Sequence, residues 1–425
     1  MTEDFLHFIW KYGLFDRTGM ISDTGEEVQV IALGEHNNDA GPDFLNARIR
    51  IGTTTWAGNV EIHLRSSDWT EHKHHLDKAY DNVILHVVHN HNLSVARSTG
   101  EVIPTIELHF NQELYENYRL LLRQKGWLPC REKIRQIDRF LFELWLSSLV
   151  VERLQQKAQY IGGLLDQYKN NWEEVFYIML ARSFGFGLNA TPFEMTAKSI
   201  SLLNLARCRN NLLQVEAILM GQAGFLDEAR LFSDYYSGLR NVYLHQQKKL
   251  GLKPIEKHLW KYLRLRPVNF PTVRIAQFAA LISEAEGLFS RVIACREITE
   301  LSRIFEVRAS SFWDSHYTFE TKSPVKAKKL GSEAFQVIVI NAVVPFLFVY
   351  GQRTGHPSLK ERALEWLNQL PPEKNRLVTR WEAAGIKAVS AFYSQGILQM
   401  STKYCGHKRC LACSVGMSII TKKFN

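Results

Sequence analysis

The chain has 425 residues, of which 46% are hydrophobic, 12% aromatic and 22% charged, and this aromatic content excludes a disordered or low-complexity protein. Residues 1–111 carry 8 Lys and Arg against 16 Asp and Glu, a formal balance of −8, whereas residues 112–425 stand at +17. We therefore expect a soluble protein of more than one domain, in which one part binds a cation and another attracts a polyanion. Two ordinary domains with unequal surface charge would give the same pattern.

The first third of the chain alternates apolar and polar residues with a period of two. An amphipathic helix is expected around Phe5–Trp10, and a second helix over Ser67–Tyr80 between the third and fourth strands. Five strands are predicted, at Val28–Leu33, Leu45–Ile51, Trp56–Leu64, Val83–Val88 and Ile103–Phe110. The order is helix, strand, strand, strand, helix, strand, with one further strand.

From about Asn111 the period changes to 3.6 residues, which predicts a mostly α-helical region up to Ser401. Its helical patterns cover 112–125, 137–168, 172–184, 193–205, 212–220, 227–250 and 272–288 before continuing to the end of the region. The fold class is therefore α+β. We expect an α/β domain at 1–115, a helical domain at 116–325 and a helical C-terminal region at 326–425.

Export and membrane insertion are not expected. Met1–Tyr12 lacks the basic start and apolar run of a secretory signal. The apolar run Val337–Tyr350 is shorter than the ~20 residues that span a bilayer and contains a proline, so it is predicted to be a buried helix. Sparse cysteines indicate a reducing compartment, and we predict a cytoplasmic protein with no membrane partner.

Two acidic residues and a histidine occupy related strand positions. Asp43 opens the second strand in Gly41-Pro42-Asp43-Phe44, and Glu61 and His63 lie two residues apart on the third strand, so these two point to one face. If the strands form a hairpin, Asp43 lies opposite that face. Such carboxylates suit Mg²⁺, which can lower the pKa of a bound water and polarise a phosphoryl oxygen. The alternative is a simple turn at Asp43 and a solvated sheet face.

In this strand order, Pro42-Asp43 and Glu61-Ile62-His63 resemble the motif of the PD-(D/E)XK nuclease superfamily, whose core runs helix, strand, strand, strand, helix, strand. The resemblance covers residues 1–111. It implies a restriction-endonuclease-like domain in which Asp43 and Glu61 bind Mg²⁺ or Mn²⁺ and His63 serves as base or orients the water. His63 replaces the lysine of the motif and brings no fixed charge at neutral pH. Very-short-patch repair endonucleases have a related fold and use histidine.

The opening helix carries Glu3, which corresponds in position to an acid found on the first helix of some superfamily members. Nearly the whole chain also resembles a bacterial conserved-hypothetical family of unknown function, with the same Gly-Pro-Asp-Phe, Val-Glu-Ile-His and Tyr-Cys segments. This second resemblance implies no activity. It does imply that both halves of the chain belong to one protein unit.

Histidines cluster directly after the third strand. On the predicted helix His72 and His75 share one face, and Asp77 and Tyr80 share another. We take His72 and Tyr80 as candidate catalytic residues that contact the scissile phosphate or orient the attacking water. A separate histidine-ligated zinc site and exposed histidines without a ligand are the alternatives.

Three cysteines near the C-terminal end, Cys405, Cys410 and Cys413, favour metal binding over disulfides. The fourth ligand is either His407 or Cys130, and the metal is either Zn²⁺ or an iron–sulfur cluster. One distant cysteine followed by three clustered ones is similar to the iron–sulfur nucleases of the same superfamily, although the spacing differs. The other two cysteines, Cys208 and Cys295, are predicted core residues.

Basic and aromatic residues alternate in the segment 257–267 and just beyond it. The predicted nucleic-acid-binding residues are Lys257, Trp260, Lys261, Arg264, Arg266 and Arg274. Alternatively, Trp260 and Leu263 are core residues and the charges solvate the outer face. The leading hypothesis is a metal-dependent nuclease acting on DNA or RNA. The alternatives are a non-catalytic nucleic-acid-binding or scaffold protein with a degenerate nuclease fold, and a histidine-ligated zinc hydrolase.

Overall fold

The structure is a computed structural model that describes residues 1–227 and 233–422. The chain divides into two compact units, one of residues 1–145 with 400–425 and one of Leu146–Gln399. The sequence predicted domain boundaries after residues 115 and 325. The first of these lies within the first unit and the second within the second unit, so neither coincides with a division between the units. The C-terminal segment joins the first unit because α18 (Ser414–Thr421) packs on α3 (Gln112–Arg123), where the Asn117 amide donates to the Ile420 carbonyl oxygen over 3.2 Å.

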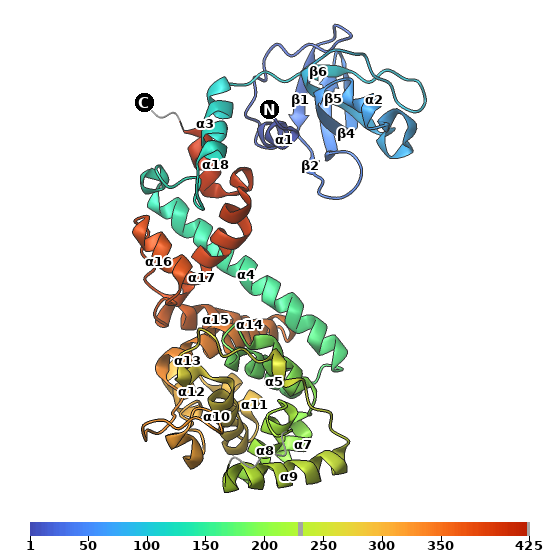
Figure 1. The fold of residues 1–425 in the computed structure, drawn as a ribbon. Helices are drawn as coiled ribbons and strands as arrows, with labels where there is room; N and C mark the ends of the chain where they lie inside the picture. The colour runs from blue at the N-terminus through green and yellow to red at the C-terminus, as the bar shows by residue number, and fades with distance from the viewer. Residues whose placement is uncertain (228–232, 423–425) are drawn as a thin grey trace. The chain divides into compact units, whose positions relative to one another are not determined.

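The first unit is built on a six-stranded mixed sheet in the order β1-β3-β4-β5-β6, with β2 paired to β3 (Figure 1). The β1/β3 and β3/β4 pairs are antiparallel, and the β4/β5 and β5/β6 pairs are parallel. The predicted α+β class, with an N-terminal sheet followed by a large helical region, is confirmed. The strands are β1 (Val28–Ala32), β2 (Glu35–His36), β3 (Phe44–Ile51), β4 (Thr54–Arg65), β5 (Val83–Asn90) and β6 (Thr105–Glu107).

Helix α1 (Glu3–Lys11) packs its apolar face against β4. Phe5, Ile9 and Trp10 are fully buried, and each such side chain contributes about 1.5–3 kcal/mol of hydrophobic stabilisation. The Trp10 indole also donates to the Leu33 carbonyl oxygen over 3.0 Å. Because residues four apart share one side of a helix, this packing carries His7 toward the sheet together with Glu3.

The connection between β4 and β5 is not the single helix predicted for Ser67–Tyr80. It consists of α2 (Asp68–Glu71) followed by two single turns, η1 (His74–Leu76) and η2 (Lys78–Tyr80). Lys73 has φ +64°, a left-handed conformation that an α-helix of L-residues does not continue through. The prediction of one continuous helix is therefore wrong, and the expected shared face of His72 and His75 does not form.

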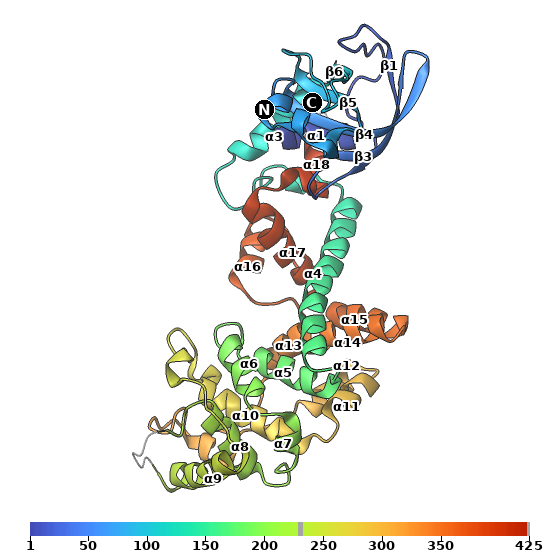
Figure 2. The ribbon, with the colours of Figure 1, turned by 90° about the vertical axis from the view of Figure 1, so that its right-hand side faces the viewer.

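The second unit is helical and has one large apolar core. Helices α5, α8 and α10, labelled in Figure 2, belong to this unit. Most of their residues are buried, as expected for helices that are apolar on all sides. The pattern predicted over 193–205 splits into α6 and α7, and residues 228–232 of the helix predicted over 227–250 lie outside the described residues. The helices after α3 are α4 (Arg139–Gln167), α5 (Trp172–Phe184), α6 (Ala190–Lys198), α7 (Leu202–Ala206), α8 (Leu212–Gln222), α9 (Asp234–Leu250), α10 (Pro271–Glu284), α11 (Leu288–Ala294), α12 (Ile298–Ile304), α13 (Ser332–Ile338), α14 (Val344–Arg353), α15 (Pro357–Gln369), α16 (Arg376–Ala383) and α17 (Ala391–Gln399).

One helical run, Ser332–Arg353, has the length and apolar composition to cross a membrane. It comprises α13, the wider turn η7 (Val339–Val343) and α14. Its most apolar part is 72% buried inside the protein, which is typical of the core helix of a soluble protein. The predicted buried helix over Val337–Tyr350 is thus confirmed.

Candidate active site

Asp43 and Glu61 lie beside each other where β3 meets β4. The register pairs Phe44 with Val60, so the residue before β3 faces Glu61. The Asp43 backbone N–H donates to Glu61 Oε2 over 3.1 Å, and the Ile62 backbone N–H donates to Asp43 Oδ2 over 2.9 Å. Burial raises the pKa of Glu61, and the Asp43 charge adds to this rise against the hydrogen bond from His74. The hairpin therefore brings the two predicted carboxylates together.

His63 lies on the same face of β4 and is 2% exposed. Its Nε2 is 3.6 Å from Glu61 Oε1 and 3.1 Å from His72 Nδ1, and its Nδ1 is hydrogen bonded to His86 Nε2 on β5 over 2.9 Å. Burial and the neighbouring histidines lower the pKa of His63 to about 2. The imidazole is neutral at pH 7 and is oriented by His86, which is how metal-ligating histidines are held.

His74, which the predicted helix did not single out, completes this group. Its Nε2 is 3.3 Å from Glu61 Oε1, and the ligand atoms of His63, His72 and His74 all lie within 4.8 Å of one another. Three imidazoles beside a carboxylate suit Mn²⁺ or Zn²⁺ better than Mg²⁺, which prefers oxygen ligands. The ligand set is richer in nitrogen than the sequence pattern indicated. His74 faces the site because the chain reverses at Lys73.

Tyr80, predicted as a catalytic residue, flanks this group. Its ring stacks on His74 with centroids 3.8 Å apart, and burial followed by the charge of Glu61 raises its pKa to about 12. The phenol therefore keeps its proton near neutral pH and can donate a hydrogen bond. His75 takes no part in the group of three ligand atoms.

His7 on α1 is a further site residue that sequence reasoning missed. Its Nε2 is 3.2 Å from Asp43 Oδ2. Burial disfavours the charged imidazole, but the close Asp43 carboxylate outweighs this effect and raises the pKa of His7. Glu3 is half-buried, and burial raises the pKa of its carboxyl group. The charges of His72 and His7 oppose this rise. The spacing of four residues between Glu3 and His7 was the available sequence signal.

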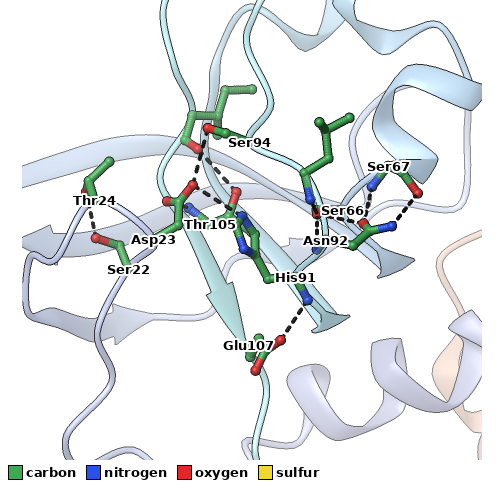
Figure 3. Close-up of polar contacts among 12 residues, drawn as sticks. Ser22, Asp23, Thr24, Ser66, Ser67, His91, Asn92, Ser94, Thr105 and Glu107 are labelled. Atoms are coloured by element: carbon green, nitrogen blue, oxygen red, sulfur yellow. Dashed lines mark hydrogen bonds and ion pairs between the residues drawn. The ribbon is translucent and has the colours of Figure 1, made fainter.

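Polar contacts at the far end of β4 fix the start of the segment that carries His72 (Figure 3). Ser66 Oγ accepts the backbone N–H groups of Asn92 and Leu93 over 2.9 and 2.8 Å. The Asn92 side chain accepts the Ser67 backbone N–H over 3.0 Å. These bonds tie the beginning of α2 to the end of β5, and so they restrict where His72 can lie.

We expect acid to destabilise the protein through His86. Burial lowers its pKa from the ordinary 6.5 to about 3. Between these values the unfolded chain binds the proton and the folded chain does not, so stability falls by up to about 1.4 kcal/mol per pH unit as the pH drops below about 6.5. His86→Gln, which keeps a polar group beside His63, should make the dependence shallower in urea unfolding between pH 7 and 5. Exposed His109→Gln is the control, and an unchanged slope in His86→Gln contradicts the assignment.

A cavity of about 570 Å³ borders His7 within the first unit. Its lining is rich in basic side chains and histidines contributed by α1, by β2 and by the segment between Cys405 and Cys413. These residues are Lys11, His36, His407, Lys408 and Arg409. Asp4 is the acidic residue of the lining, and the three cations Lys11, Lys408 and Arg409 outnumber it, so the hollow beside His7 has the chemistry to receive a phosphate group.

The structure brings Cys130 to Cys405, Cys410 and Cys413. Each thiol has its pKa raised first by burial, and the charges of its cysteine neighbours raise the pKa values of Cys130 and Cys405 further. Cys413 is the N-cap residue of α18, and the nearby backbone N–H groups of Gly416 and Val415 act against the rise in the pKa of its thiol. The thiolate-bound Zn²⁺ or iron–sulfur cluster stays a prediction, since the close group of ligand atoms in the described residues is the histidine group and not the cysteines.

His407, the other predicted fourth ligand, is exposed and lines the cavity beside His7. Gly416 is needed where it stands, because a Cβ there would lie 2.1 Å from the Cys410 carbonyl oxygen. The close approach of α18 to the cysteine loop therefore depends on this glycine. Cys295 is buried and Cys208 half-buried in the second unit, as expected for structural cysteines.

The predicted nucleic-acid-binding strip is only partly on the surface. Lys257, Lys261, Arg264 and Arg266 are exposed. Trp260 is 6% exposed in the core, and its indole donates to the Ala223 carbonyl oxygen, so it is not available to stack on a base and this prediction is corrected. Leu263, offered with it as a core residue, is 81% exposed. Arg274 is buried and lines a cavity that is open to solvent at its rim.

Comparison with known proteins shows which family the chain belongs to. No curated protein matches it, and no solved structure matches it either. The resemblance to the PD-(D/E)XK superfamily stays a prediction that rests on the residues and strand order described above. The model of a family described as a protein of unknown function (DUF2851) matches residues 3–376, and the chain belongs to this family.

Proposed function

We propose that the first unit is a divalent-metal-dependent nuclease that hydrolyses phosphodiester bonds of DNA or RNA. The observation that carries this proposal is the convergence of Asp43, Glu61 and His63 from two adjacent strands, with the ligand atoms of His72 and His74 beside them. Glu61 and the three imidazoles are the residues that would hold Mn²⁺ or Zn²⁺, and Asp43 with Glu61 those that would hold Mg²⁺. When bound, such an ion polarises a phosphoryl oxygen and lowers the pKa of a water molecule.

The remaining side chains have distinct roles in this proposal. Asp43 lies within ion-pair distance of His7 and keeps that imidazole protonated to higher pH, so His7 can give a proton to the leaving oxygen. His63 stays neutral and acts by ligation or by orienting water, since its pKa of about 2 leaves it a weak base. Tyr80 donates a hydrogen bond from the flank of the site.

The basic cavity beside His7 supports a polyanionic substrate. Lys408 and Arg409 come from the cysteine-rich segment and are exposed, while Lys11 comes from α1. The Lys408 ammonium also donates to the Leu122 carbonyl oxygen over 2.7 Å, which fixes its place on the cavity wall. Cations in the cavity that His7 borders would orient the phosphate backbone without reading base sequence.

The experiment is a cleavage assay of the full chain on single- and double-stranded DNA and RNA with Mg²⁺, Mn²⁺ or Zn²⁺ supplied separately. We expect cleavage that requires added metal and is strongest with Mn²⁺, since that ion accepts both carboxylate and imidazole ligands. Salt-dependent binding without turnover in any metal would instead support a non-catalytic nucleic-acid-binding protein. Absence of both binding and cleavage would overturn the proposal.

A further inference from the structure

The second unit contains a cavity of about 720 Å³ that the nuclease proposal does not use. It lies between α10, the segment 266–269 before it and the segment 326–337 that leads into α13. This volume is within the range of small-molecule sites. Five cationic residues line it: Arg266, Arg274, Lys326, Lys328 and Lys329. The carboxylate in the lining, Glu333, is exposed and already paired with Lys374 over 2.9 Å.

Arg274 is the most informative of these residues, because it is 6% exposed and its charge is not neutralised. Its Nη1 donates to Gln277 Oε1 over 2.8 Å and its Nη2 to Asn269 Oδ1 over 2.5 Å, both neutral amides. Its buried Nε has no hydrogen-bond partner. Burial lowers the pKa of Arg274 to about 10, so the guanidinium stays charged at pH 7. Among the described residues no carboxylate pairs with it, and a buried cation left this way is costly.

Lys328, which also lines this cavity, is a second buried cation. It is 5% exposed, and its ammonium donates to the Asp314 backbone carbonyl oxygen over 3.3 Å and to Ser323 Oγ over 2.9 Å. The same ammonium lies 4.3 Å from the ring centre of Tyr317. The Asp314 carboxylate is bonded to Arg308 over 2.9 Å, and although its charge also acts on Lys328, burial outweighs it and lowers the pKa of that ammonium. Two buried cations thus face one cavity and have neutral hydrogen-bond acceptors.

Phe186 connects this cavity with a second one of about 390 Å³ lined by Arg153, Lys157 and Arg182. Phe186 has φ +47°, a strained conformation for a residue with a side chain, and the Arg274 guanidinium lies 4.4 Å from its ring centre. Strain of this kind gathers at ligand sites. In the second cavity Arg182 is already paired with Glu194. An aromatic ring thus borders the first, cationic cavity, which suits a ligand with both an anionic and an aromatic part.

We propose that this cavity binds an organic phosphate of about mononucleotide size, with the phosphate held by Arg274 and Lys328. The planar guanidinium offers its free Nε–H and the ammonium offers a point charge, a pairing that favours phosphate. A free nucleotide and the 5′-phosphate at the end of a nucleic acid present the same chemistry. The proposal stands apart from the nuclease site, because every residue that carries it belongs to the second unit.

The test is calorimetric titration of the full chain with AMP, adenosine and inorganic phosphate. AMP should bind, adenosine should bind at least about tenfold more weakly, and phosphate should compete with AMP. The double variant Lys326→Gln/Lys329→Gln removes two exposed charges from the cavity rim and should weaken AMP about tenfold. Lys248→Gln/Lys249→Gln removes two exposed charges outside the cavity and is the matched control.

Arg274→Gln should weaken AMP further, and thermal melting reports whether that variant folds. Glu61→Gln should bind AMP as the unaltered chain does, which separates this site from the nuclease site. Competition by a 5′-phosphorylated oligonucleotide, but not by its 5′-hydroxyl form, identifies a chain end as the ligand, and no competition by either identifies a free nucleotide. Equal binding of AMP and adenosine, no AMP binding, or the same loss in the control variant would overturn the proposal.

Discussion

Replacing Asp43 with asparagine or Glu61 with glutamine is expected to lower metal-dependent cleavage by at least on the order of 10²–10³-fold. Both substitutions keep the side-chain volume and one oxygen, so the hydrogen bonds from the Ile62 and Asp43 backbone N–H groups can persist. What is lost is the negative charge that would hold a divalent ion and, at Asp43, the charge that raises the pKa of His7. Initial rates of oligonucleotide cleavage against metal concentration measure the effect.

The matched control is Asp39→Asn, which removes an exposed carboxylate from the turn just before Asp43. Its rate should stay within about twofold of the unaltered chain, because its charge is screened by solvent. Glu61→Gln should also raise the metal concentration needed for half-maximal rate, whereas a purely structural defect would lower the melting temperature without that change. Full activity in both Asp43→Asn and Glu61→Gln, at unchanged melting temperature, would remove the three converging residues from the chemistry.

Replacing Cys413 or Cys130 with serine should abolish binding of about one metal equivalent and lower the melting temperature of the first unit by about 10 °C or more. A structural metal bound by four thiolates contributes its binding free energy to folding, because the site does not exist in the unfolded chain. Cys413 is the N-cap residue of α18, so a metal bound there would also hold the start of that helix. Elemental analysis and calorimetry of the purified chain make the measurement.

Cys208→Ser is the control, since Cys208 lies in the second unit apart from the cluster. It should retain the metal and shift the melting temperature far less. Zinc without visible absorbance identifies a zinc site, whereas iron with visible absorbance identifies a cluster. Lys408 and Arg409 lie between Cys405 and Cys413, so a cysteine variant that loosens this segment also displaces them from the cavity wall. The cysteine variants should therefore have lower nuclease activity as well. A chain that carries no metal and melts unchanged in Cys413→Ser would contradict the site.

The alternation of apolar and polar residues predicted most of the sheet. Five of the strands were predicted within a few residues, because a half-buried strand shows its alternation directly in the sequence. The period of two also placed Glu61 and His63 on one face, and the hairpin then had to bring Asp43 next to them. The helix predicted over Ser67–Tyr80 failed because nothing local marks Lys73 as left-handed.

By itself, the sequence determined the α+β class, the strand faces and the residues Asp43, Glu61 and His63, since each follows from local periodicity along one element or two neighbours. The tertiary structure alone decided that His7 and His74 join them, that Cys130 meets the C-terminal cysteines, and that Arg274 faces a cavity while Trp260 is core. These pairings join residues distant along the chain or separated by an irregular turn. Helix packing and one left-handed residue fix them, and periodicity encodes neither.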